Sequence, residues 1–288
     1  IENIKVQISK DMKNKDPKTR RISTACYLIY RTAMRVGDEK DPDEADTVGA
    51  TTLRKEHIKL SGNTIEFDFL GKDSVRWKET IPAEEQDKQF YNNLKELISN
   101  KKDSQEVFDG ITSRHVNAYY STIVKGLTAK VFRTYLASNI VSKYLRKHDN
   151  IKSESDMKKL FHAKLANLDA AKMCNHKRTI PKNFDQTLQK KKETLHNIEN
   201  ANPWQRSEIL LKKAESKITK TEKQKEMHKE RIKKIKIVIK KKKNKHAERI
   251  EKLQLQIDLT QKTRDYNLGT SLRNYIDPRI FKTWTDEV

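Results

Sequence analysis

The sequence predicts a mainly α-helical protein with a small β hairpin or sheet near its start and a projecting antiparallel helical hairpin near its end. Three observations support this fold class. The 288 residues include only seven Gly and six Pro, which favours long helices over a turn-rich β fold. Residues 64–81 alternate apolar and polar side chains as strands do. Residues 181–260 contain no Gly and repeat apolar residues at coiled-coil-like spacing.

The composition points to a polyanionic partner. The net charge is +22, and 35% of the residues are charged against 34% that are hydrophobic. Such a surface favours nucleic acid and gains affinity by releasing counterions, so binding should weaken steeply as salt rises. Cys26 and Cys174 cannot form a disulfide framework, and nothing resembles a signal peptide or a membrane span. The sequence therefore predicts a nucleic-acid-binding protein of a reducing compartment.

Residues 1–36 are predicted to be helical. One apolar face is formed by residues at spacings of three and four, namely Ile22, Cys26, Ile29 and Ala33. Gly37 supplies the C-terminal stop. Arg35 is therefore expected in the last turn of this helix.

A β hairpin is predicted next. Ile65, Phe67 and Phe69 alternate with acidic residues, which indicates a half-buried strand over residues 64–70. The segment Gly71-Lys-Asp-Ser74 has turn chemistry, and residues 75–81 form the returning strand. Lys72 is therefore expected at the tip of a hairpin, where it is exposed and can enter a groove.

Residues 84–178 are predicted to form a helical array, with helices over residues 87–100, 112–123, 128–137 and 164–174. Thr128 is a candidate N-cap for the third of these helices. Lys130 and Arg133 are three residues apart in that helix, so they share one of its faces.

The charged segment that follows is predicted to be an antiparallel helical hairpin. Residues 181–260 carry 23 Lys and Arg against 11 Asp and Glu, a net charge of +12. Asn202-Pro203 should interrupt the first helix. The chain could reverse at Asn202 or within the lysine-rich stretch that runs up to Asn244. The lysines are either simply solvated or in contact with phosphates, and the sequence leaves both interpretations open.

A short helix is predicted over residues 268–279. Gly269 breaks the preceding structure, Thr270 or Ser271 caps the helix, and Pro278 stops it. Tyr275 lies on this helix, flanked in sequence by Arg273 and Arg279. A phenol is a poor nucleophile at neutral pH, but cationic neighbours favour the reactive phenolate. Considered alone, Tyr275 is either a nucleophile or a half-buried core tyrosine.

Five motifs, in this order, need a common explanation. They are Ala33-Met-Arg-Val-Gly-Asp-Glu-Lys40, Phe69-Leu-Gly-Lys-Asp-Ser74, Gly126-Leu-Thr-Ala-Lys-Val-Phe-Arg-Thr-Tyr135, Cys174-Asn-His-Lys-Arg178 and Leu268-Gly-Thr-Ser-Leu-Arg-Asn-Tyr275. Together they closely resemble the catalytic domain of type IB DNA topoisomerases, in the eukaryotic-like branch that includes archaeal members. The resemblance runs from about residue 1 to Lys282. It implies a catalytic core over 1–181, a linker hairpin over 182–261 and a C-terminal tyrosine segment over 262–288.

The resemblance and the chemistry of these side chains imply the same reaction. Tyr275 attacks a DNA phosphodiester, Arg35 and Arg133 bridge the non-bridging oxygens, and His176 donates a further hydrogen bond. Lys72 is the candidate general acid for the 5′ oxygen. The family forms a 3′-phosphotyrosine, lets the downstream duplex rotate to relax either sign of supercoil, and reseals the strand without ATP. The motifs contain no acidic cluster with metal-ligand spacing, so no metal or other cofactor is expected.

Further DNA contacts are expected from Lys130, Asp73, Asn274 and Arg273. The expected partner is double-stranded DNA, bound by a monomer without a membrane anchor. The expected location is the chromosome, in the nucleus of a eukaryote or the cytoplasm and nucleoid of an archaeon.

Two alternative functions share some of these features. Tyrosine recombinases have the same nucleophile and arginines, but they usually carry His-x-x-Arg where this chain has Lys130-x-x-Arg133, and the linker hairpin also argues against them. A non-catalytic DNA-binding fragment is the second alternative, although every catalytic role is filled. Relatives of this branch have an upstream lobe that caps the duplex, and the chain starts after the point where it would end. Weaker, more salt-sensitive and more distributive relaxation is therefore expected of this piece alone.

Taken singly, the site residues also have structural interpretations. Arg35 could be a cation at a helix C-terminus, and Lys72 an ordinary turn lysine. Cys174 and His176 are two potential metal ligands without a second pair, which do not make a zinc site. The order of all five motifs is what favours the catalytic interpretation.

Overall fold

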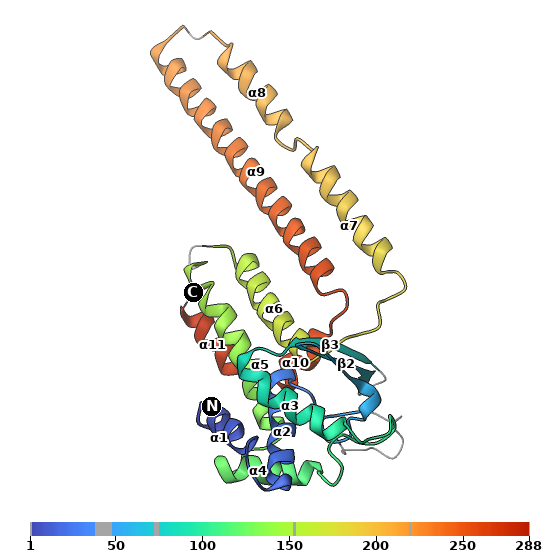
Figure 1. Cartoon of the computed structure of the whole chain (residues 1–288). Coiled ribbons are helices and arrows are strands. Elements are labelled where there is room, and N and C mark those ends of the chain that lie inside the picture. The colour runs from blue at the N-terminus through green and yellow to red at the C-terminus, as the bar shows by residue number, and fades with distance from the viewer. Residues whose placement is uncertain (1, 38–47, 72–74, 152–153, 219, 288) are drawn as a thin grey trace. The chain divides into compact units, whose positions relative to one another are not determined.

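The computed structural model describes residues 2–37, 48–71, 75–151, 154–218 and 220–287 (Figure 1). It comprises two compact units. The first is Ile1–Ser153, His162–Arg178 and Asp265–Val288, and the second is Glu154–Phe161 and Thr179–Arg264. Each unit is mainly helical, and the predicted fold class is confirmed.

The predicted helical start forms two helices, α1 (Glu2–Asp11) and α2 (Pro17–Thr32). Helix α2 ends at Thr32 because Ala33 is left-handed, with φ 51°, and its N–H donates to the Ile29 carbonyl. The prediction that Arg35 lies in the last turn of a helix is therefore wrong, since Arg35 follows this cap in a non-helical segment. Alanine is the best helix former, so its residue type gave no sign of this end.

A three-stranded antiparallel sheet follows, with β1 (Ile58–Ser61), β2 (Thr64–Leu70) and β3 (Arg76–Pro82) in that order. Strands β2 and β3 are the predicted hairpin, and Phe69 pairs with Trp77 near its end. Strand β1 was missed, although the Gly62-Asn63 pair before β2 is a two-residue turn signal. Lys72 and Asp73 lie outside the described residues.

The first core lies among the sheet, α1, α2, α3 (Lys88–Ile98), α4 (Ser113–Ile123) and the start of α5 (Ala129–Arg146). Its largest fully buried side chains include Phe67, Phe90, Phe108, Tyr120 and Phe132. A fully buried carboxylate, Asp87, accepts a hydrogen bond from the Tyr27 hydroxyl at 2.8 Å and pairs with Arg31 at 2.9 Å. This core fixes α2, from which Arg35 emerges, against α5, which carries Arg133.

Thr128 caps α5, as predicted, and its hydroxyl accepts a hydrogen bond from Val131 N at 3.3 Å. We expect Thr128→Ala to lower the free energy of unfolding by about 1 kcal/mol, because the amide at the helix start loses its partner. Urea denaturation measures this loss. Thr128→Ser keeps the hydroxyl and should stay close to wild type. Equal destabilisation by both substitutions would contradict the capping role.

The second core joins α5 to α6 (Asp156–Met173), to α11 (Pro278–Glu287) and to Tyr275 and Ile276, which follow α10 (Leu268–Asn274). Its buried members include Val141 and Leu145 on α5, Ala170 on α6 and Trp284 on α11. Tyr275 is also a member, with only 6% of its surface exposed. The tyrosine segment is thus packed into the first unit by its own apolar core.

The chain leaves and re-enters this unit at paired backbone positions. Arg178 N donates to Asp265 O at 3.0 Å, and Lys177 forms an antiparallel bridge with Tyr266. One step further on, Asn267 N donates to His176 O at 2.7 Å. The segments on either side of the second unit therefore run side by side within the first.

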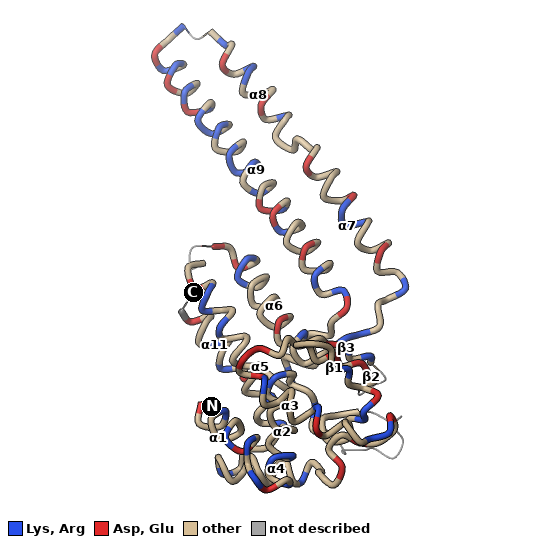
Figure 2. The backbone as a smooth tube through the Cα atoms, viewed as in Figure 1, with Lys and Arg blue, Asp and Glu red and all other residues tan. Residues whose placement is uncertain are grey.

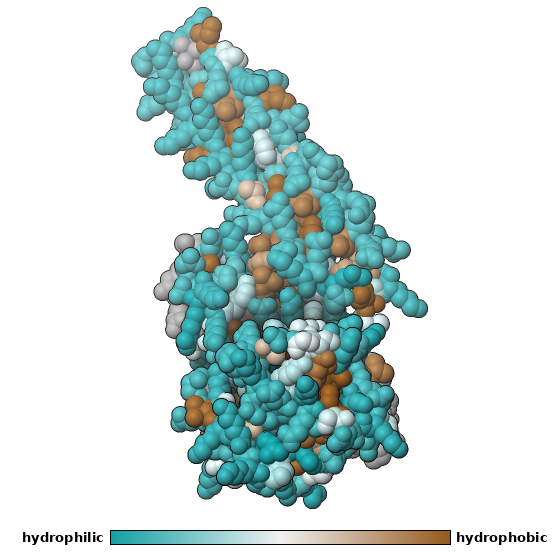
Figure 3. All heavy atoms as spheres, in the orientation of Figure 1, coloured by the Kyte–Doolittle hydropathy of each residue, from teal (hydrophilic) through white to brown (hydrophobic). Residues whose placement is uncertain are grey.

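The second unit contains an antiparallel helical hairpin of α7 (Phe184–Glu199), α8 (Gln205–Glu215) and α9 (Glu222–Lys262). The predicted interruption at Asn202-Pro203 separates α7 from α8, and the chain reverses between α8 and α9. Figure 2 shows Lys and Arg along much of α9. The hairpin surface in Figure 3 is mostly hydrophilic. Few apolar residues are buried between its helices, among them Phe184, Ala214, Ile239 and Ile257.

No helix in the described part of the chain combines the length and apolar character needed to cross a membrane.

Candidate active site

Tyr275 follows the last residue of α10, and its N–H donates to Ser271 O at 3.0 Å. The predicted caps of this helix are wrong. Asn267 is the N-cap, and its Oδ1 accepts from the amides of Gly269 at 3.0 Å and Thr270 at 3.4 Å. Gly269 therefore lies inside the first turn rather than before the helix.

Arg133 is the cation at the tyrosine hydroxyl. Its Nη1 donates to Tyr275 Oη at 3.0 Å, and its Cζ lies 4.7 Å from the centroid of the phenol ring. Its Nε donates to the Ala33 carbonyl at 2.5 Å, and the residue is only 4% exposed. The left-handed turn at Ala33 thus orients the guanidinium, because it directs this carbonyl at Nε.

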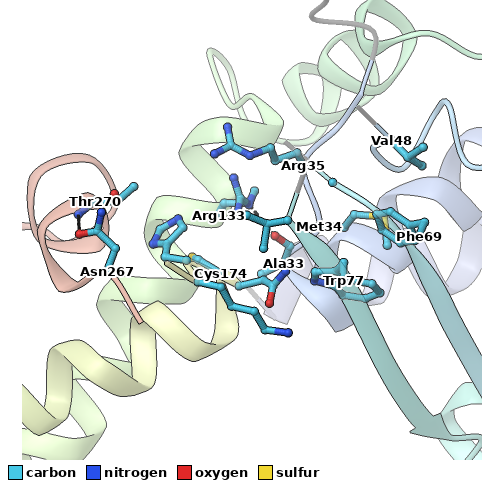
Figure 4. Close-up of a pocket in the computed structure, with 15 residues that line it drawn as sticks. Ala33, Met34, Arg35, Val48, Phe69, Trp77, Arg133, Cys174, Asn267 and Thr270 are labelled. Carbon is cyan, nitrogen blue, oxygen red and sulfur yellow. Dashed lines mark hydrogen bonds between the residues drawn. The ribbon is translucent and has the colours of Figure 1, made fainter. Parts of the chain in front are cut away.

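Arg35 and Arg133 line a cavity of about 130 Å³. Figure 4 shows both between Asn267 and Thr270 on one side and Phe69 and Trp77 on the other. The two aromatic rings stack with centroids 5.1 Å apart and form an apolar wall. Two guanidinium groups beside such a wall favour an anionic ligand, because arginine can bind two oxygens of one anion at fixed geometry.

His176 lines the same cavity, and its ring centroid lies 5.1 Å from that of Tyr275. The residue is 7% exposed, and neither ring nitrogen has a hydrogen-bond partner among the described residues. Burial, together with the nearby charges of Arg133 and Arg35, lowers the pKa of His176 to about 4. The imidazole is therefore neutral at pH 7 and has one N–H to donate to a ligand.

The lowered pKa of His176 predicts a loss of stability in acid. Between pH 6.5 and about pH 4 the unfolded chain binds a proton at this imidazole that the folded chain does not. The free energy of unfolding should therefore fall as the pH drops through this window, and should not depend on this group above it. We expect urea denaturation at pH 7 and pH 5 to show a larger loss for wild type than for His176→Gln. Equal losses would contradict this prediction.

The remaining predicted residues lie around the site or outside the described part. Lys130 is exposed and lines a second cavity, of about 300 Å³, with Arg35, Arg133 and Tyr275. Arg273 and Asn274 are exposed on α10.

Arg279, by contrast, does not serve the tyrosine hydroxyl. It is 86% exposed at its side chain and hydrogen-bonds Asp277, and this contact lowers the pKa of Asp277 to about 2. Arg273 and Arg279 flank Tyr275 in sequence, but the cation that contacts its hydroxyl is Arg133.

Sequence reasoning missed two groups that hold the side chains of the candidate site. The first is the Ala33 carbonyl. The second is Ser138 on α5, whose Oγ accepts from Asp277 N at 3.0 Å and donates to Tyr275 O at 3.4 Å. A backbone carbonyl leaves no sequence signal, and Ser138 could have been noticed only as a small polar residue shortly after Arg133 in the same helix.

The four described residues predicted to be catalytic, Arg35, Arg133, His176 and Tyr275, therefore surround adjoining cavities. Their donors could bind the oxygens of a phosphodiester while a phenol oxygen lies beside them. Within the described ranges, no three His, Cys, Asp or Glu side chains are grouped so that they could hold a metal ion.

Comparisons with known proteins identify the family. The family model described as eukaryotic DNA topoisomerase I, catalytic core, matches residues 1–209, and the C-terminal topoisomerase domain matches residues 247–288. DNA topoisomerase 1 of Caenorhabditis elegans is 36% identical over 303 residues, which cover 99% of this chain and 34% of the relative. DNA topoisomerase 1 of Homo sapiens is 34% identical over 293 residues, with 99% and 36% covered.

The mitochondrial DNA topoisomerase I of Homo sapiens is 33% identical over 293 residues, which cover 99% of this chain and 46% of the relative. The chain thus spans about a third of the length of the first two relatives and less than half of the third. The chain belongs to the eukaryotic DNA topoisomerase I family.

Proposed function

We propose that this chain carries out the transesterification of a type IB DNA topoisomerase, nicking one strand of duplex DNA and resealing it. The observation that carries the proposal is the 3.0 Å contact between Arg133 Nη1 and Tyr275 Oη, beside an imidazole whose ring nitrogens have no hydrogen-bond partner in the described part of the chain. Family membership supports the same reaction.

In the proposed cleavage step, Tyr275 Oη forms a bond to the phosphorus and loses its proton to water as the bond from phosphorus to the 5′ oxygen breaks. Arg35, Arg133 and the neutral His176 donate to the non-bridging oxygens, whose negative charge grows in the transition state. Lys72 protonates the departing 5′ oxygen. Support for Lys72 comes from its neighbours, because Gly71 and Val75 both line the cavity that Arg35 and Arg133 share.

The product is a 3′-phosphotyrosine and a free 5′ hydroxyl. The covalent link stores the energy of the broken bond, so attack by the 5′ hydroxyl reseals the strand without ATP. Between the two steps the downstream duplex rotates about the intact strand, which relaxes positive and negative supercoils. The lysine-rich α9 lies close to the rotating DNA in this proposal, where its charge slows rotation.

Double-stranded DNA is the proposed partner, bound by a monomer at the chromosome, and a mitochondrial form also occurs among the human relatives. Lys130, Arg273 and Asn274 are exposed and available for DNA contact, and Asp73 is proposed from the resemblance alone. The division into core, linker and C-terminal segment likewise stays a prediction.

The proposal is tested with positively and negatively supercoiled plasmids in EDTA and without ATP. We expect relaxation of both and, on a nicked duplex, an adduct at the 3′ end of the cleaved strand. Strand exchange between paired duplexes would favour a recombinase instead. DNA retention with neither relaxation nor adduct would overturn the proposal.

A further inference from the structure

Asn167 on α6 joins the tyrosine segment to the helix that leads to His176. Its Nδ2 donates to Leu268 O at 3.0 Å, and its Oδ1 accepts from Ser271 Oγ at 2.7 Å. Asn167 is 5% exposed and Ser271 is fully buried. The amide nitrogen and the amide oxygen of Asn167 therefore both bond to α10, at buried positions.

We propose that Asn167 is a positioning residue for the nucleophile, acting through Ser271 on Tyr275. The proposal rests on the proposed function, since it assumes that Tyr275 is the nucleophile. It assigns a role to a side chain that contacts neither the cavity nor the phenol.

The path from Asn167 to the nucleophile is short. Ser271, whose hydroxyl is held by Asn167, accepts the N–H of Tyr275 at its carbonyl, at 3.0 Å. Leu268, the second partner of Asn167, is the first residue of α10. The amide thus fixes both the start of the helix and the turn from which Tyr275 emerges.

Asn167 also gives the nucleophile and the imidazole a common support. Helix α6 ends at Met173, and the left-handed Asn175, with φ 52°, turns the chain to His176. A shift of α10 along α6 would change the separation of the Tyr275 and His176 rings, now 5.1 Å between centroids. A displacement of about 1 Å at a reacting group can slow a reaction by about 100-fold.

Asn93 provides a matched control for the loss of a buried amide. It is 3% exposed, and its Nδ2 donates to Met12 O at 2.9 Å and to Thr24 Oγ1 at 2.8 Å. All these partners belong to the region of the first core, and none belongs to the tyrosine segment. Asn93→Ala should therefore destabilise the chain without moving Tyr275.

The test compares Asn167→Ala, Ser271→Ala, the double variant and Asn93→Ala at a temperature where each is folded. Single-turnover formation of the covalent adduct is measured on a suicide duplex at saturating protein, and DNA affinity is measured separately in the Tyr275→Phe background. We expect Asn167→Ala and Ser271→Ala to cleave roughly 10- to 100-fold more slowly at unchanged DNA affinity. The double variant should be little slower than the slower single variant, because both single substitutions remove the hydrogen bond between Asn167 and Ser271.

A wild-type cleavage rate in Asn167→Ala, or an equal loss in Asn93→Ala, would overturn the proposal. Absence of an adduct with wild type would refute the proposed function instead. Hydrogen exchange of the backbone amides then tests whether Asn167 holds α10 in place, without any cleavage reaction. Asn167→Ala should lower the protection of amides in residues 268–276 and Asn93→Ala should not, and unchanged protection would overturn the positioning role. If Asn167→Ala does not fold, Ser271→Ala carries both measurements.

Discussion

Tyr275→Phe is expected to abolish the covalent protein–DNA adduct, lowering its rate of formation by more than about 10³-fold. The substitution removes only the oxygen that would bond to phosphorus, and the ring can keep its place in the second core. DNA affinity should therefore change little. The measurement is denaturant-quenched trapping on a nicked or suicide duplex, in EDTA without ATP, alongside a binding titration.

Tyr144→Phe is the matched control, because Tyr144 is a half-buried tyrosine that packs against the same core and contacts His162 through its hydroxyl. It should form the adduct at close to the wild-type rate. An adduct that persists in Tyr275→Phe would move the nucleophile to another residue and remove the basis of the proposed function.

Arg133→Lys should slow cleavage by about 10² to 10³-fold, the usual effect of losing one donor to a transition-state oxyanion. The substitution keeps the positive charge but loses the planar guanidinium, whose several N–H groups point in fixed directions. Arg133 bonds Ala33 O through Nε and Tyr275 Oη through Nη1, and its remaining N–H groups can donate to phosphate. A single ammonium cannot hold these partners in the same geometry. Single-turnover cleavage at saturating DNA measures the effect.

Arg146→Lys makes the same exchange at an exposed position on the same helix and should leave the cleavage rate unchanged. If Arg133→Lys cleaved as fast as Arg146→Lys, charge alone would account for the role of Arg133. The forked geometry would then have no part in the reaction.

The side chains that meet at the candidate site could be predicted from sequence more readily than the backbone that holds them. Arginine, histidine and tyrosine are the residue types that phosphoryl transfer to a phenol requires, and their motifs occur in a recognisable order. The end of α2 could not be predicted in the same way. Ala33 leaves the helical conformation, and its carbonyl accepts a hydrogen bond from Arg133, a residue distant in sequence.

The capping of α10 shows the same limit. Thr270 and Ser271 are both suitable caps by residue type, and Asn267 is equally suitable. The hydroxyl of Ser271 is instead engaged by Asn167 from another helix, which leaves Asn267 to serve the helix start. Local propensity cannot decide between candidates when a tertiary hydrogen bond occupies one of them.

The backbone pairing at Arg178 and Asp265 makes the position of Tyr275 independent of the length of the chain between those two residues. Once those two backbones are bonded, a change in the length of the hairpin beyond them need not move Tyr275, although Glu251 and Lys262 on α9 also contact Lys158 and Phe161 on α6. Insertions or deletions of equal length in the two arms, near the reversal between α8 and α9, should therefore leave the backbone around Tyr275 in place.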